Sequence, residues 1–187
     1  MTEGILTAAL SFAATNLDDI VILMLLYSAA RDARGRAGVT AGQFLGVGVL
    51  TAASLLGAAG LRLLPPEYLR WLGFVPLLLG LYSWLQRKAE DSPEFRPGAG
   101  RGKVLSVALL TVANGGDNLG VWLPLFAGYS PARRFAAVAV FAAMTGLWCF
   151  LGRHLSTLPG VAGFLQRHGR ALVPWVLMLL GLYILFV

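Results

Sequence analysis

Six apolar runs, each long enough or nearly long enough to cross a lipid bilayer, dominate this chain of 187 residues. A spanning helix needs about 20 mostly apolar residues. Only 13% of the residues are charged and 57% are hydrophobic, so the chain could not cover the surface of a soluble protein. The sequence therefore predicts an all-α integral membrane protein with six transmembrane helices. The runs cover residues 4–30, 37–61, 71–86, 104–132, 135–152 and 171–187.

The basic residues lie between the apolar runs or at their ends. Eleven of the fifteen fall in the connections between runs one and two, three and four, and five and six. Because cytoplasmic loops of membrane proteins carry an excess of Lys and Arg, we expect these connections in the cytoplasm and both termini outside. The net charge of +6 is then loop charge that orients the protein in the bilayer, and we expect no nucleic-acid partner.

The chain divides into two blocks of three predicted helices, residues 1–86 and 104–187, joined by a polar cytoplasmic linker over residues 87–103. The sequence Leu-Leu-Gly-Leu-Tyr at residues 78–82 recurs at residues 179–183. A block with an odd number of helices must enter the membrane from the opposite side when it is repeated. The sequence therefore predicts two inverted three-helix repeats, an arrangement that places binding sites near the midplane of many secondary transporters.

Three acids interrupt the apolar runs: Asp18 and Asp19 in the first, and Asp117 at the corresponding position of the fourth. No Lys or Arg lies deep in a run to pair with them. One such acid costs about 2.5–3.5 kcal/mol at the centre of a spanning helix, so three cost on the order of 8–10 kcal/mol. We expect a cation, protons or both to offset this free energy at a functional site.

Amide and hydroxyl groups accompany these acids at helical spacings, and a continuous fourth helix would place four of them on one face. Two adjacent glycines weaken that helix, and a break there would free backbone carbonyls. Such oxygens suit divalent cations, although interhelical hydrogen bonding is the alternative interpretation. The candidate metal ligands are Asn16, Asp18, Asp19, Asn114, Asp117 and Asn118, with Thr15, Thr111, Gly115 and Gly116 as additional ligands or helix breaks.

The two polar segments resemble the hallmark motifs of the cadmium resistance transporter family, which belongs to the lysine exporter superfamily. They read Ala14-Thr-Asn-Leu-Asp-Asp-Ile-Val-Ile-Leu-Met24 and Ala113-Asn-Gly-Gly-Asp-Asn-Leu-Gly-Val-Trp-Leu-Pro-Leu-Phe126. The length and the predicted repeat also match, so the resemblance covers the whole chain. It implies export of cadmium and related divalent cations from the bacterial cytoplasm, and it implies that the six candidate ligands form the substrate site.

The residues themselves leave the metal open. Cadmium favours thiolates, but neither motif contains Cys or His, and the oxygen donors equally suit manganese, calcium or magnesium. Sulfur could come from Cys149, Met144 or Met24, which we interpret first as packing residues. His154 and His168 we interpret as members of a solvated loop, with proton release or metal delivery as the alternative.

We therefore predict a transporter of the bacterial inner membrane, and not an enzyme, that exports cadmium, with zinc or manganese as other substrates. No ATP-binding loop is present, so an ion gradient or the membrane potential must supply the energy, with protons as the expected coupling ion; no cofactor is expected. An exporter of amino acids or organic cations, or a metal-sequestering membrane protein, remains an alternative. Gly42-xxx-Gly46 predicts close packing within the protomer or in a homodimer, and the five Trp are interpreted as interface anchors.

Overall fold

The computed structural model describes residues 2–30, 32–61 and 101–158, together with positions 74, 77, 78, 81, 175, 178, 179 and 182. Every regular element in these residues is an α-helix, which confirms the all-α part of the predicted fold class. The predicted helices over residues 71–86 and 171–187, their shared Leu-Leu-Gly-Leu-Tyr sequence, most of the linker and His168 lie outside the described residues. Six spans and an inverted repeat therefore stay predictions.

Two of the predicted spans are each broken into a pair of shorter helices. The first consists of α1 (Thr2–Thr15) and α2 (Asp19–Ser28), which meet at a bend of 62°. The second consists of α6 (Arg101–Asn114) and α7 (Gly116–Gly128), which meet at 69°. A helix of 10 to 14 residues covers only about half of a bilayer core about 30 Å thick, so each break falls near the middle of its span.

The other two described elements are long unbroken helices, α3 (Ala33–Leu61) and α8 (Pro131–Leu155). Both are long and apolar enough to cross a membrane, and the described part of the chain holds up to four spans if each bent pair counts as one. Pro131 occupies the first turn of α8, where its fixed φ suits a helix start and its missing N–H costs no bond. The preceding helix ends at Gly128, slightly before residue 132, where the sequence predicted the end of this span.

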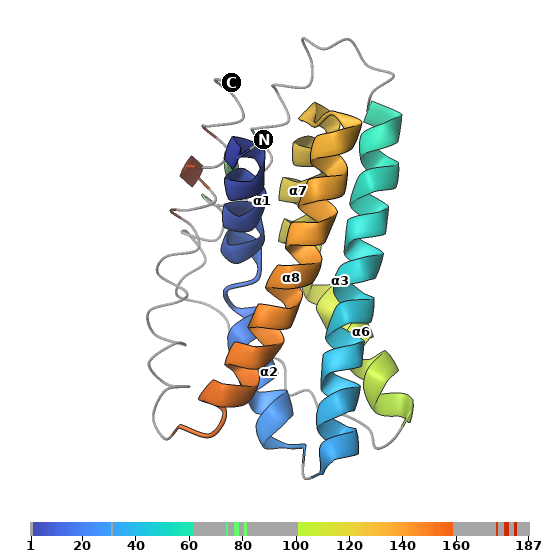
Figure 1. Ribbon diagram of the computed structural model, residues 1–187, viewed down its shortest axis with the longest axis vertical. Coiled ribbons are helices and arrows are strands. Elements are labelled where there is room, and N and C mark those ends of the chain that lie inside the picture. The colour runs from blue at the N-terminus through green and yellow to red at the C-terminus, as the bar shows by residue number, and fades with distance from the viewer. Residues whose placement is uncertain are drawn as a thin grey trace.

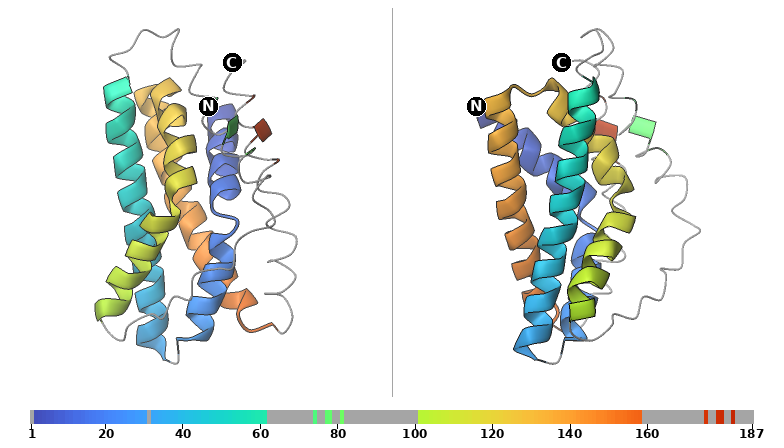
Figure 2. Two further views of the ribbon diagram at one scale, coloured as in Figure 1. Left: turned by 180° about the vertical axis from the view of Figure 1, so that it is seen from behind. Right: turned by 90° about the vertical axis from the view of Figure 1, so that its right-hand side faces the viewer.

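The two broken spans run in opposite directions, and so do the two long helices (Figure 1). The starts of α3 and α6 and the end of α8 lie at one end of the bundle. The basic residues near these three helix ends therefore lie at that same end. Figure 2 shows α3 between α8 on one side and the α6–α7 pair on the other. This antiparallel arrangement of the two halves is the one that an inverted repeat requires.

Each long helix packs mainly on the broken span of the other half. Helix α3 lies against α6 and α7, whereas α8 lies against α1 and α2. The close approach of α3 depends on Gly42 and Gly46, because a Cβ at either position would fall within 3 Å of Val107 or Thr111. The Gly42-xxx-Gly46 motif therefore mediates packing within the protomer.

Candidate functional site

The two helix breaks coincide with the two polar segments that the sequence singles out. The break at Gly115 confirms the expectation from the adjacent glycines, and Gly115 precedes the first residue of α7. The break after Thr15 was not expected, because this segment contains neither Gly nor Pro. Here Asp18 caps α2 by accepting a hydrogen bond from the backbone N–H of Asp19, at 3.1 Å.

A pair of amides joins the two breaks directly. Asn16 Nδ2 donates to Asn118 Oδ1 at 3.1 Å, and Asn118 Nδ2 faces Asn16 Oδ1 at 3.5 Å. Both side chains are buried, and Thr15 Oγ1 accepts a further bond from Asn16 Nδ2 at 3.0 Å. The structure therefore brings together Thr15, Asn16 and Asn118, from opposite halves of the chain.

Gln43 of α3 makes a second connection, which the sequence analysis missed. Its Nε2 donates to Asp19 Oδ2 at 3.0 Å, and its Oε1 accepts a bond from Thr111 Oγ1 at 2.7 Å. All three side chains are buried. A single amide in an apolar helix is only weak evidence in the sequence for a functional residue. Gln43 does, however, lie on the same face of α3 as Gly42 and Gly46, which pack against α6.

The three carboxylates lie at the starts of the second half-helices. Asp18 and Asp19 begin α2, and Asp117 is the second residue of α7, where its Oδ1 accepts the N–H of Asn118 at 2.9 Å. The positive end of a helix dipole stabilises negative charge at such positions. Asp18 lies close enough to Asp19 and Asp117 for the negative charges of ionised carboxylates to repel one another.

The carboxylates differ in exposure, and Asn114 stands apart from the buried amides. Asp19 is buried, Asp117 is half-buried and Asp18 is exposed. Asn114 is exposed at the end of α6, so the predicted common face of Thr111, Asn114, Asp117 and Asn118 is wrong. That prediction assumed one continuous helix, whereas the bend of 69° turns the two parts of the span away from each other.

Acidic, His and Cys side chains do not account for a metal site by themselves. Within residues 2–30, 32–61 and 101–158, no three of them are grouped so that they could hold one metal ion. A bound divalent cation would need amide, hydroxyl or backbone oxygens to complete its coordination. The breaks supply such groups, because the last carbonyls of α1 and α6 lack some of their intrahelical partners.

The indole of Trp148 satisfies one carbonyl at the first break. Trp148 Nε1 donates to the backbone oxygen of Asn16 at 2.6 Å. Its ring packs edge-on against Phe12 with a centroid distance of 5.5 Å, and Phe12 stacks on Trp122. Trp148 and Trp122 are both buried, so their predicted role as interface anchors is wrong. They and the phenylalanines beside them form an apolar wall next to the amide pair.

We expect Trp148→Phe to destabilise the protein more than Trp122→Phe does. Both changes remove similar ring volume from one cluster, but only Trp148 leaves a buried carbonyl without its donor, which costs about 1–3 kcal/mol. The Trp122 indole N–H has no hydrogen-bond partner in the described structure. Unfolding free energies measured in detergent micelles would compare the two variants, and equal losses would contradict a supporting role for the Trp148 bond.

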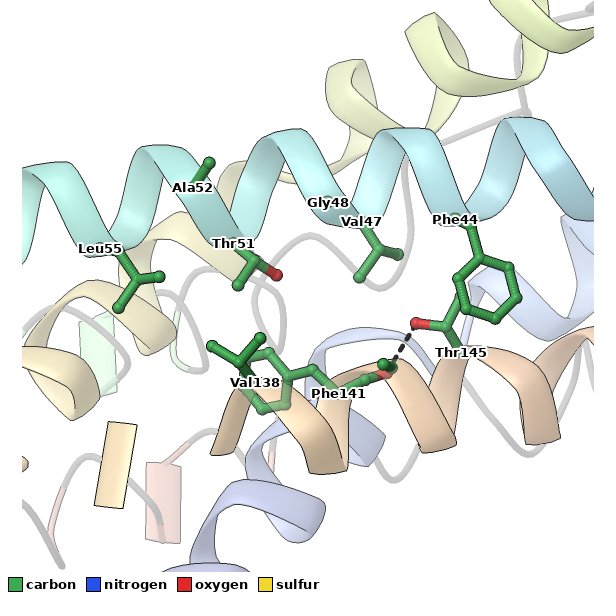
Figure 3. A pocket seen from close by; sticks show the side chains of 10 residues that line it. Phe44, Val47, Gly48, Thr51, Ala52, Leu55, Val138, Phe141 and Thr145 are labelled. Carbon is green, nitrogen blue, oxygen red and sulfur yellow. Dashed lines mark hydrogen bonds between the residues drawn. The ribbon is translucent and has the colours of Figure 1, made fainter. Parts of the chain in front are cut away.

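A cavity of about 300 Å³ between α3 and α8 is separate from the two breaks (Figure 3). Its lining is mostly apolar and includes none of the predicted site residues. Thr145 faces this space, but its hydroxyl donates to the Phe141 carbonyl at 2.7 Å. The cavity therefore offers few oxygen ligands, and the break region remains the candidate metal site.

The sulfur-containing and imidazole side chains lie where packing or solvation explains them. Met24 and Cys149 are buried in the hydrophobic core, and Met144 packs against it. His154 is exposed in the last turn of α8, which extends beyond the predicted end at residue 152, and its ring stacks on Phe150. These positions agree with the packing and solvated-face interpretations.

Comparison with known proteins identifies the family of this chain. The family model described as cadmium resistance transporter matches residues 12–187, which include both polar segments and nearly the whole chain. No curated protein and no solved structure matches the chain. A match of this extent, on a helical protein whose two broken spans meet at buried amides and carboxylates, shows that the chain belongs to the cadmium resistance transporter family.

Proposed function

We propose that this protein is a secondary transporter that exports divalent cations, cadmium foremost, from the bacterial cytoplasm through the site between the two helix breaks. The observation that carries the proposal is the meeting of two broken spans from opposite halves at the Asn16–Asn118 pair, with Asp19 and Asp117 beside it. Broken helices of this kind bind ions near the midplane of transporters. The family match supports cadmium as the substrate.

Export requires a step that releases the cation outside. In the proposed mechanism, protons from the outside compete with the metal for Asp18, Asp19 and Asp117, so that inward proton movement drives outward metal movement. A carboxylate must be deprotonated to bind a metal ion, so protonation of any of these side chains would weaken the binding of the cation. The basic residues gathered at one end of the bundle support a cytoplasmic location for that end.

The direct test is cadmium flux in proteoliposomes under an imposed proton gradient, with Asp117→Asn as the variant. We expect gradient-driven flux in the wild type and its loss in the variant, because the half-buried Asp117 would no longer contribute a charge to the site. Flux that ignores the proton gradient would exclude proton coupling. Cadmium binding without flux would indicate sequestration, and inhibition by lysine without inhibition by other metals would indicate an organic-cation exporter.

A further inference from the structure

Gln43 occupies a position that connects the carboxylate of one broken span to the other broken span. Its side chain is only 3% exposed, and its amide lies between Asp19 of α2 and Thr111 of α6. In the structure the amide nitrogen points to the carboxylate and the amide oxygen to the hydroxyl. This orientation is the favourable one while no cation lies at Asp19, because an N–H donor faces a carboxylate oxygen.

The hydroxyl of Thr111 allows the opposite orientation without losing a hydrogen bond. Thr111 Oγ1 carries one proton and has two acceptors within reach, Gln43 Oε1 at 2.7 Å and the Val107 carbonyl at 3.1 Å. If the amide turns by half a rotation, Gln43 Nε2 donates to Thr111 Oγ1, and the Thr111 proton goes to the Val107 carbonyl. The turned amide then presents its oxygen toward Asp19.

Two oxygens facing each other repel, so the turned amide is unfavourable unless a cation lies between Gln43 Oε1 and Asp19 Oδ2. A divalent cation reverses this preference, because it attracts both oxygens. The described residues contain no group of three acidic, His or Cys side chains that could hold the ion, so neutral oxygens are needed. Gln43 is the buried amide already hydrogen-bonded to the Asp19 carboxylate.

We propose that Gln43 is a ligand of the transported cation, and that its amide turns over when the cation binds at Asp19. This inference rests on the proposed function and adds a residue from α3 to the site. The turn also reverses the direction of the hydrogen bond between Gln43 and Thr111. Cation binding at Asp19 in the first broken span therefore changes the hydrogen bonding of Thr111 in the second broken span. An amide oxygen is a harder ligand than a thioether sulfur, so a sulfur at residue 43 would shift the preference of the site toward soft cations such as cadmium.

Two variants of similar size, Gln43→Met and Gln43→Leu, separate ligation from packing. Both remove the hydrogen bonds to Asp19 and Thr111, but only Met offers a donor atom, a soft thioether sulfur. We would measure Cd²⁺ and Mn²⁺ binding to purified protein in nanodiscs by competition with a fluorescent chelator. Relative to Gln43→Leu, we expect Gln43→Met to raise the Cd²⁺ to Mn²⁺ affinity ratio about tenfold. An equal ratio in the two variants would overturn the proposal.

A third variant, Gln43→Glu, distinguishes a ligand from a residue that only positions Asp19. When ionised, Glu keeps an oxygen toward the site and an acceptor for Thr111, but it no longer donates to Asp19. If Gln43 is a ligand, the Gln43→Glu variant should bind both metals at least as tightly as the wild type. If Gln43 only donates a hydrogen bond that positions Asp19, the Gln43→Glu variant should bind both metals as weakly as Gln43→Leu does. The second result would overturn the proposal. Absence of metal binding in the wild type would instead refute the proposed function itself.

Discussion

Replacing Asp19 with Asn is expected to abolish cadmium transport while leaving the fold intact. The Asn oxygen can still accept the bond from Gln43 Nε2, so the local packing is kept and only the charge is lost. Mutation of a group that only orients a metal ligand already lowers metal affinity by about 10–100-fold. Loss of a charged ligand should therefore reduce cadmium flux at least about a hundredfold. The measurement is cadmium efflux from proteoliposomes, normalised to reconstituted protein.

The matched control for this variant is Asp32→Asn, which also removes one carboxylate. Asp32 is exposed before α3, where its Oδ1 accepts the N–H of Gly35 at 2.8 Å. We expect this variant to transport at the wild-type rate. The melting temperature of Asp19→Asn should equal or exceed that of the wild type, because a buried carboxylate is costly in the membrane. Retained flux in Asp19→Asn would remove Asp19 from the transport path.

The second large effect is expected at the contact between α3 and α6, where Gly42→Ala should destabilise the protein. A Cβ at residue 42 would lie 2.6 Å from Val107 Cβ and 2.7 Å from the Val104 carbonyl oxygen, which is backbone and cannot rotate away. Overpacking of this kind costs about 1–3 kcal/mol. The strain would also move Gln43, one residue away, relative to Thr111, so cadmium flux should fall with stability.

Gly48→Ala on the same helix is the control, because no atom lies within 4 Å of its added Cβ. An ordinary Gly→Ala change inside a helix stabilises by roughly 0.5–1 kcal/mol. The two variants should therefore shift the free energy of unfolding in opposite directions, as measured by denaturant titration in mixed micelles. The same shift in both would show that α3 and α6 do not approach as closely as described.

The polar residues of this apolar sequence marked both segments in which a span is broken, but only one of the two breaks was predicted. The paired glycines before Asp117 predicted the second break, because they weaken a helix directly. At the first break the chain offers only side chains that compete for backbone hydrogen bonds, Thr15, Asn16 and Asp18, and those are also common in unbroken helices. The amide pair that joins the breaks depends on tertiary contact, which no local pattern specifies.

The side chains that contact the candidate site residues were harder to predict than the candidate site residues themselves. Gln43 is one neutral amide in a span without charge, so its importance emerges only where α3 meets α2 and α6. Trp148 was predicted to lie at the membrane interface because it lies near a span end. In the fold its indole turns inward to a carbonyl that the helix break leaves available, and that carbonyl cannot be foreseen without the break.

The reciprocal packing of the long helices also constrains the order in which the protein can be assembled. During synthesis α3 precedes α6 and α7, its main partners among the described helices, so the contacts of Gly42, Gly46 and Gln43 with α6 form only after residues 62–100 have been made. The contacts of α1 and α2 with α8 form later still, after α8 has been inserted. The contacts that join the described helices of the two halves, the Asn16–Asn118 pair among them, therefore form only after α7 has been translated.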